Sequence, residues 1–164
     1  MNNIILAKEN IKIIPCDYSN YIHCKAVVDL MREYMQDAMG NSPPLDAEGN
    51  HRLIEGLKSH PTAITLLALY DSTFVGLTNS FLNFATFKAY SFLNIHDLIV
   101  HKNYRGKKIG DLLMEATILF AKYNQCSKIT LEVREDNLVA QKLYEKYGFS
   151  YTQPKMLFWV KDMK

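Results

Sequence analysis

The segment from Leu98 to Gly110 constrains the fold of this chain more than any other. An apolar run with the composition of a strand ends at Val100 and leads into a short turn with two glycines, and a helical pattern begins directly after it. The first N–H groups of a helix have no partner within the helix, and the helix dipole favours negative charge beside them. Gly106 and Gly110 let the backbone approach a ligand closely. The segment therefore predicts a phosphate site at a strand-to-helix junction.

The side chains of the turn add charge to this predicted site. Arg105, Lys107 and Lys108 bring three cationic groups next to the expected helix N-terminus. The spacings of the P-loop and of the dinucleotide-binding glycine motif are both absent, so neither of these phosphate sites is indicated. The alternative is a solvated basic turn without a ligand. The position of the turn between a strand and a helix favours the phosphate role.

Hydrophobic periodicity predicts strands and helices that alternate along a chain of 164 residues, a length typical of one domain. Hairpins come early and strand–helix–strand units come later. This order predicts an α/β protein with α+β character, in which helices flank a mixed sheet. The predicted strands are 11–14, 63–70, 74–84, 92–100, 128–133 and 156–160, and the predicted helices are one capped by Ser19 or Asn20 and broken at Gly40, then 46–58, 111–123 and 139–147.

Composition restricts the classes of protein to which the chain can belong. A net charge of +2 is too small to indicate nucleic-acid binding by itself. Cys16, Cys24 and Cys126 lack metal-ligand spacing and are odd in number, so neither a metal site nor a disulfide framework is predicted. The start at Met1–Asn3 is polar, and no apolar stretch is long enough to span a membrane. Together with reduced thiols, these features predict a cytoplasmic protein that is not membrane-bound.

The basic turn resembles the acyl-CoA motif of the GNAT acyltransferase superfamily. That motif is [QR]xxGx[GA] and follows a strand. Arg105 and Gly110 match its first and last positions, whereas Lys108 stands where the middle glycine is usual.

A second block of the chain resembles the other signature of the same family, a strand followed by N-x-x-A-x-x-L-Y-x-x-x-G-F. The match runs from Asn137 to Phe149 and includes Ala140 and Tyr144. The two signatures occur in the order of the family, with one amphipathic helix and one strand between them. The resemblance covers about residues 93–149, the motif-bearing core of a single N-acetyltransferase domain expected over residues 1–164.

The resemblance implies a fold and an activity. The fold has a central mixed, mostly antiparallel sheet that is splayed between two parallel strands and flanked by about four helices. The activity is transfer of an acetyl group from acetyl-CoA to a primary amine of a small molecule or peptide, by direct attack in a ternary complex. No cysteine lies in either motif, so a covalent acyl-cysteine route has no obvious nucleophile. The resemblance implies neither a metal nor a nucleic-acid or membrane partner, and it is compatible with a homodimer.

The resemblance also implies which residues hold acetyl-CoA. The pantetheine arm would pair with the strand that ends at Val100, whose N–H would polarise the thioester carbonyl, and the turn would hold the pyrophosphate. Without the resemblance, Leu98 and Val100 are ordinary core residues and Asn137 is a helix N-cap. The implied cofactor-binding residues are Leu98, Ile99, Val100, Arg105, Gly106, Lys107, Lys108, Ile109, Gly110, Asn137, Ala140 and Tyr144.

Tyr144 is the residue that the resemblance implies as proton donor to the departing CoA thiolate. A phenol has an ordinary pKa of about 10 and is therefore protonated at neutral pH. The alternative is a half-buried helix tyrosine without a chemical role. Tyr147, one helical turn later, is expected to serve packing.

The sequence leaves the general base open among His96, Asp97 and a chain of water molecules. Successive strand residues point to opposite faces, so at most one of His96 and Asp97 is expected to face the substrate. By the same alternation, His96 is expected to share a face with Leu98 and Val100. Glu33 and Glu132 are further carboxylates that could reach the site.

The acceptor site is expected between residues 31–50, which include Tyr34, and an aromatic segment formed by Phe81, Phe84, Phe87 and Tyr90. The aromatic residues are equally compatible with a core.

Two other functions stay open. One is a catalytically silent acyl-CoA-binding module of the same fold. The other is a nucleic-acid-binding protein that uses the basic cluster 102–108 on a phosphate backbone.

Overall fold

A computed structural model describes residues 5–163. The polar start at Met1–Asn3, where no leader is predicted, lies outside the described residues, as do Ile4 and Lys164. Within residues 5–163, six strands form one sheet in the order β1-β2-β3-β4-β5-β6. The strands are β1 (Leu6–Lys8), β2 (Ile11–Pro15), β3 (Ala63–Tyr70), β4 (Thr73–Ala85), β5 (Tyr90–Val100) and β6 (Ile129–Leu131), and the helices are α1 (Tyr21–Gln36), α2 (Ala47–Ser59), the short 3₁₀ helix η1 (Lys102–Tyr104), α3 (Ile109–Tyr123) and α4 (Leu138–Lys146).

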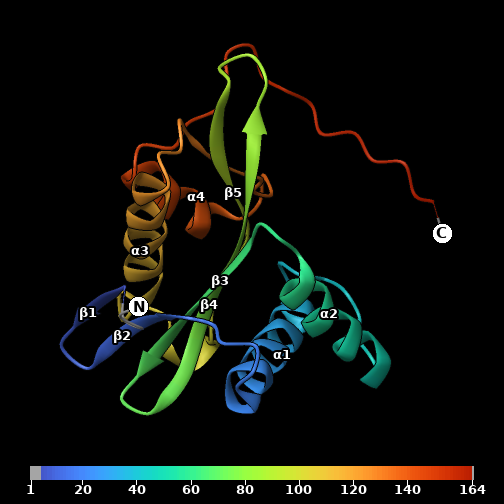
Figure 1. Cartoon of the computed structure of the whole chain (residues 1–164), viewed down its shortest axis with the longest axis vertical. Helices are drawn as coiled ribbons and strands as arrows, with labels where there is room; N and C mark the ends of the chain where they lie inside the picture. The colour runs from blue at the N-terminus through green and yellow to red at the C-terminus, as the bar shows by residue number, and fades with distance from the viewer. Residues whose placement is uncertain (1–4, 164) are drawn as a thin grey trace.

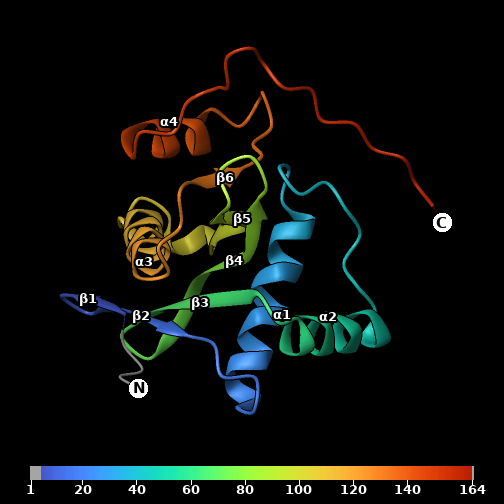
Figure 2. The ribbon, with the colours of Figure 1, turned by 45° about the horizontal axis from the view of Figure 1, so that its top comes forward.

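Helices cover both faces of the sheet (Figures 1 and 2). On one face, α1 and α2 bury Val27 and Leu57 against the strand residue Leu77. On the other face, α3 buries Leu113 against Val75. All neighbouring strands are antiparallel except β5 and β6, which are parallel. The predicted mixed, mostly antiparallel sheet with flanking helices is thereby confirmed.

Two helices begin at polar N-caps, the first of which, Asn20, is one of the two caps that the sequence predicts. The side chain of Asn20 accepts a hydrogen bond from the N–H of Ile22 at 2.9 Å, at the start of α1. The side chain of Asp46 accepts one from the N–H of Gly49 at 2.7 Å, at the start of α2. Each cap satisfies a backbone donor that the helix itself leaves unpaired, and this explains why both helices start where they do.

The parallel strands β5 and β6 separate after a short stretch of pairing. Their register joins Leu93 to Ile129, Asn94 to Thr130 and Ile95 to Leu131, and β6 ends there. Beyond Ile95, the edge of β5 that faces away from β4 has no strand partner among the described residues. This separation is the splay that the resemblance implies, and it leaves backbone groups of residues 96–100 available to a ligand.

Near each end of the described residues, the predicted strands differ from those of the structure. The strand expected over Met156–Val160 is wrong, because these residues lie in an extended tail that leads away from the sheet (Figure 1). The apolar run has the composition of a strand, yet Trp159 is 84% exposed, and a strand needs a partner to form hydrogen bonds. At the other end, the hairpin strand β1 was not expected, because its three residues are too few to show a period.

Among residues 5–163, no helix is both long enough and apolar enough to cross a membrane.

Candidate functional site

The turn between β5 and α3 has two residues in the left-handed region. Gly106 has a φ of +78° and Lys108 has a φ of +61°. Lys108, at the N-cap of α3, thus adopts the conformation that glycine adopts without strain, at the position where the family motif usually has its middle glycine. Its side chain forms no capping hydrogen bond, so the first N–H groups of α3 remain available to an anion.

Gly110 lies at the meeting point of three elements. A Cβ atom at this position would lie 3.3 Å from Leu143 Cδ2 of α4, 3.8 Å from Val100 Cγ2 and 4.0 Å from Leu98 Cδ2 of β5. The absence of a side chain therefore lets the start of α3 come close to both β5 and α4. Leu98, Val100 and Gly110, for which the resemblance implies a role in cofactor binding, are brought together.

The side chain of Arg105 bonds to other residues of the protein and does not stand free beside the turn. Its Nε donates to the carbonyl of Val100 at 3.2 Å, and its guanidinium forms an ion pair with Asp37 at 2.9 Å. Hydrogen bonds from the N–H of Met39 and from Arg105 lower the pKa of Asp37. The side chain thus ties the turn to the end of α1, and the charge that it offers to a phosphate is already partly neutralised.

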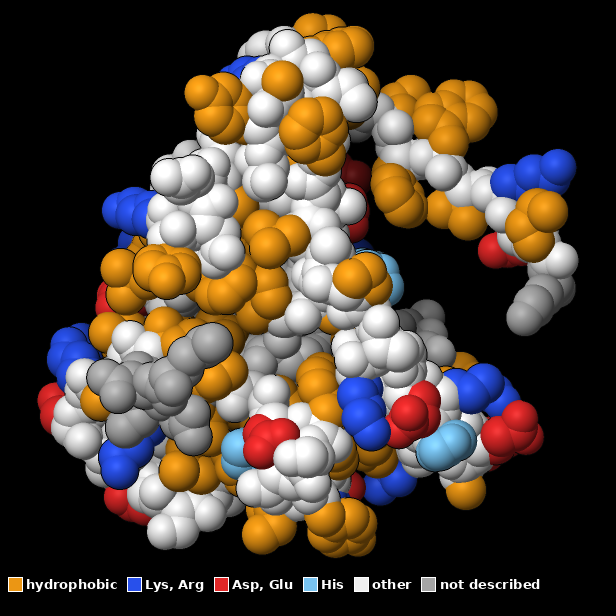
Figure 3. Space-filling model, in the orientation of Figure 1, with side chains coloured by type: hydrophobic (Ala, Val, Ile, Leu, Met, Phe, Trp, Pro, Cys, Tyr) orange, Lys and Arg blue, Asp and Glu red, His pale blue; other side chains and the backbone are white. Residues whose placement is uncertain are grey.

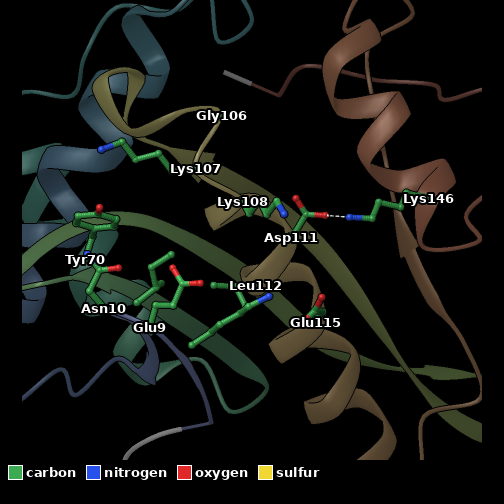
Figure 4. A pocket seen from close by; sticks show the side chains of 12 residues that line it. Glu9, Asn10, Tyr70, Gly106, Lys107, Lys108, Asp111, Leu112, Glu115 and Lys146 are labelled. Carbon is green, nitrogen blue, oxygen red and sulfur yellow. Dashed lines mark hydrogen bonds and ion pairs between the residues drawn. The ribbon is translucent and has the colours of Figure 1, made fainter.

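Lys107 and Lys108 border a cavity of about 580 Å³ beside the turn (Figure 4). The ammonium group of Lys107 lies 4.9 Å from the ring centre of Tyr70, within the range of a cation–π contact. Lys146 of α4 forms an ion pair with Asp111 at the edge of the cavity. The carboxylates of Glu9 and Glu115 also line the cavity, so a phosphate at the turn would meet groups of both charges.

The second signature forms the start of α4. Asn137 is the N-cap, and its side chain accepts a hydrogen bond from the N–H of Ala140 at 3.2 Å. The capping role that the sequence offered as an alternative for Asn137 is confirmed. Tyr144 lies one turn after Ala140 and packs near Phe149, with 6.0 Å between the ring centres.

The phenol of Tyr144 is partly buried, and burial raises its pKa to about 12. The neighbouring phenol of Tyr34 and carboxylate of Asp97 are smaller causes of the same increase in pKa, so the three groups lie near enough to influence one another. Burial likewise raises the pKa of Tyr34, with Asp97 as the next cause. These side chains come from α4, α1 and β5 and gather beside the splay.

A β-bulge in β5 sets the position of Asp97. Asn79 of β4 pairs with Asp97, while the next residue, Ser80, pairs with Ile95, so His96 is the extra residue. The alternation of faces is therefore interrupted at His96.

The expected sharing of a face between His96, Leu98 and Val100 is wrong because of this bulge. The ring of His96 packs edge-on against Phe81, on the side of α1 and α2, whereas Val100 packs on the side of α3. His96 Nδ1 lies 4.0 Å from Asp97 Oδ1, so both side chains lie on the same side of β5. Asp97 is 17% exposed and His96 is 65% exposed.

The remaining candidate residues lie farther from this group or have other partners. Glu33 accepts a hydrogen bond from the N–H of Lys102 at 2.7 Å and pairs with His101 at 3.1 Å. Glu132 is exposed. The hydroxyl of Tyr147 donates to Glu115 at 3.0 Å, in agreement with its expected packing role.

The aromatic segment separates into two parts. Phe81 packs between the rings of His60 and His96. Phe84, Phe87 and Tyr90 are exposed at the tip of the long β4–β5 hairpin, where apolar side chains gather at the top of Figure 3. These three side chains form no wall of a site near Tyr144.

Sequence reasoning missed two buried polar residues of the site, Thr65 and Asn79. Thr65 lies inside the otherwise apolar strand β3 and Asn79 lies in a polar stretch of β4, and they are 3% and 2% exposed. For Thr65, a polar residue within an apolar strand was the available signal, since buried polar groups need partners. For metals, the described residues contain no group of three or more His, Cys, Asp or Glu side chains arranged to hold an ion.

Known proteins resemble this chain in sequence and in fold. A sequence profile described as Acetyltransferase (GNAT) family matches residues 26–149. The chain is 33% identical over 54 residues to a putative [ribosomal protein bS18]-alanine N-acetyltransferase of Bacillus subtilis (strain 168). That match covers 33% of this chain and 36% of the relative, so the chain spans about a third of the length of the curated relative.

Two solved structures share the fold. A probable acetyltransferase superposes with a TM-score of 0.80 at 19% identity, over 93% of this chain and 98% of the other. The aminoglycoside N-acetyltransferase AAC(6')-Iy, solved in complex with CoA, superposes with a TM-score of 0.75 at 12% identity, over 96% and 98% of the two chains.

Proposed function

The chain belongs to the acetyltransferase (GNAT) family, and on this premise we propose that it is an acetyl-CoA-dependent N-acetyltransferase that acts on a primary amine. The observation that carries the proposal is the grouping of Tyr144 and Asp97 beside the unpaired edge of β5. A protonated phenol can serve as the general acid, and a carboxylate as the general base, in acyl transfer from a thioester to an amine.

The residues of the turn and of β5 fit an acyl-CoA. The uncapped N-terminus of α3 suits a pyrophosphate, with Lys107 and Lys108 nearby. The unpaired edge of β5 offers backbone groups to the amides of a pantetheine arm, and the N–H near Val100 is the donor for the thioester carbonyl. Acetyl-CoA, when bound, supplies the activated acetyl group.

Tyr144 is the proposed general acid. Its pKa of about 12 keeps the phenol protonated at neutral pH, so it has a proton to give to a departing thiolate. Within residues 5–163, its hydroxyl makes no hydrogen bond with another side chain, which leaves the proton available to a substrate atom.

Asp97 is the proposed general base. An amine is protonated at neutral pH and must lose a proton before it can attack. The carboxylate is mostly buried and lies near Tyr34 and Tyr144, whereas His96 is directed toward Phe81. The Asp97 carboxylate therefore takes the proton, either directly or through one water molecule.

Direct transfer is the proposed route. Burial raises the pKa of all three cysteine thiols, that of Cys16 to about 12, so none is an activated nucleophile.

The acceptor proposed is a small molecule or peptide with a primary amine. This agrees with the names of two similar proteins, which refer to an alanine of a ribosomal protein and to an aminoglycoside.

A panel of amines tests the proposal. Purified protein is incubated with acetyl-CoA and polyamines, aminoglycosides or peptides with free N-termini, and free thiol and acetylated product are measured together. Product that appears only with enzyme and an amine supports the transferase. Binding of acetyl-CoA without product from any amine favours the catalytically silent module.

A further inference from the structure

A line of hydrogen bonds runs through the centre of the sheet to Asp97. Asp97 Oδ2 accepts from Asn79 Nδ2 at 2.9 Å, and Asn79 Oδ1 accepts from Thr65 Oγ1 at 2.6 Å. Thr65 Oγ1 in turn lies 2.6 Å from the hydroxyl oxygen of Tyr18. The side chains come from β5, β4, β3 and the segment before α1, so the line crosses three adjacent strands.

The donors of this line all point toward Asp97. If the amide of Asn79 were reversed, its oxygen would face the Asp97 carboxylate, and two acceptors would repel each other. The hydroxyl hydrogen of Thr65 is used on Asn79, so the Tyr18 hydroxyl must donate to Thr65. Burial raises the pKa of Tyr18 to about 12, which keeps this hydroxyl a donor at neutral pH.

Apolar side chains could pack at the positions of Thr65 and Asn79 without needing hydrogen-bond partners. Neighbouring positions on β3 and β4 hold Leu67 and Leu77, both fully buried. A buried amide or hydroxyl is unfavourable unless it is paired, and the oxygen partners of these groups are one another and Asp97. The line of hydrogen bonds therefore ends at the Asp97 carboxylate.

The two oxygens of Asp97 have different surroundings. Oδ2 is held by Asn79, whose amide also lies 3.6 Å from Met31 Sδ. Oδ1 lies 4.0 Å from His96 Nδ1, beyond hydrogen-bonding distance. Asn79 thus holds one oxygen of the carboxylate, while the other oxygen accepts no hydrogen bond from the described residues.

We propose that Tyr18, Thr65 and Asn79 are positioning residues that aim Oδ1 of Asp97 at the amine of the acceptor. The inference rests on the proposed function, in which Asp97 takes the proton of the amine. A chain of aligned donors fixes the rotamer of the carboxylate and stabilises its negative charge.

Substitutions at Thr65 test the proposal with little change in volume. Thr65→Val removes the hydroxyl that orients Asn79 and should lower kcat about tenfold, the loss expected when a charge-assisted hydrogen bond is weakened. KM for acetyl-CoA should not change, because the cofactor contacts other residues. Thr65→Ser keeps the hydroxyl and should restore kcat to nearly the wild-type value. Thr78→Val is the matched control, because Thr78 is equally buried but lies outside the line.

Combining Thr65→Val with Asp97→Ala distinguishes a positioning role of Thr65 from a purely structural one. In the Asp97→Ala background, Thr65→Val should lower kcat no further, because the residue that it positions is already absent. An equal loss of kcat in both backgrounds, or a wild-type kcat in Thr65→Val, overturns the proposal. Tyr18→Phe is the second variant, at the far end of the line, and should give a smaller loss with the same dependence on Asp97.

A measurement independent of turnover keeps this inference distinct from the proposed function. The side-chain amide protons of Asn79 are followed by NMR in the wild type, in Asp97→Ala and in Thr65→Val. Shifts of these resonances in both variants show the line in solution, and unchanged resonances overturn it. A wild type that forms no product with any amine contradicts the proposed function, whatever the Asn79 resonances show.

Discussion

The guanidinium of Arg105 lies 2.9 Å from the carboxylate of Asp37, and this pair connects the proposed cofactor turn to the end of α1. The two residues are 68 positions apart in the sequence. Asp37 also accepts a hydrogen bond from the N–H of Met39 at 3.0 Å. The end of α1 is therefore tied directly to the turn.

Asp37→Asn should lower the free energy of unfolding by about 1 kcal/mol at pH 7, since it removes a charge that has two hydrogen-bond donors. The pKa of Asp37 is lowered in the folded protein, so its stabilisation is present above the unfolded pKa of about 3.9 and is lost as pH falls through the folded pKa. Urea unfolding at pH 7 and near pH 3.5 measures the difference, which should shrink at the lower pH. Asp29→Asn, at an exposed helix pair, is the control and should have little effect.

Tyr144→Phe should lower kcat by about 10² to 10⁴-fold, the usual contribution of a general acid. The dissociation constant of acetyl-CoA should remain close to that of the wild type, because the hydroxyl is proposed to act on the leaving thiolate. Steady-state kinetics and calorimetry give the two quantities. Tyr147→Phe, which loses the hydrogen bond to Glu115, should keep its kcat. A Tyr144→Phe variant with unchanged turnover excludes Tyr144 from the mechanism.

Gly110→Leu should weaken acetyl-CoA binding at least about tenfold, or about 1.4 kcal/mol. Even a Cβ atom would lie 3.3 Å from Leu143 Cδ2, so a larger side chain must enter the space between α3, β5 and α4. Calorimetric titration measures the affinity, and the melting temperature shows whether the variant is folded. The control is Gly56→Leu, because a side chain at Gly56 meets nothing within 4 Å. Equal affinities for the two variants would refute this placement of the pyrophosphate.

Lys108→Gly should stabilise the protein by up to about 1 kcal/mol. A residue other than glycine in the left-handed region is strained by about 1–2 kcal/mol, and the greater freedom of glycine in the unfolded chain offsets part of the gain. Lys108→Ala removes the same charge but keeps the strain. Urea unfolding should rank Gly above Ala, and the reverse order would mean that the lysine side chain stabilises the turn.

Much of the fold follows from local patterns in the sequence. The caps at Asn20 and Asp46 start α1 and α2, and the strand–turn–helix segment leads from β5 to α3. These features depend on a few adjacent residues, so a single sequence reveals them. The apolar run Met156–Val160 shows the limit, because strand composition does not supply a neighbouring strand.

The candidate site was less accessible to sequence reasoning. The bulge at His96 shifts the face of every later residue in β5, and no local pattern marks it. The contact between Arg105 and Asp37 and the approach of Asn79 to Asp97 both join residues that are distant in sequence. Such relationships arise only when the sheet and helices assemble.

Calorimetric titration of the purified protein with acetyl-CoA, with desulfo-CoA and ATP as comparisons, tests the central claim most directly. The account predicts binding of both CoA compounds at one site, without binding of ATP, because the edge of β5 recognises the pantetheine arm and the turn recognises the pyrophosphate. No detectable binding of either CoA compound would contradict the account and leave the turn as a site for a different phosphate ligand.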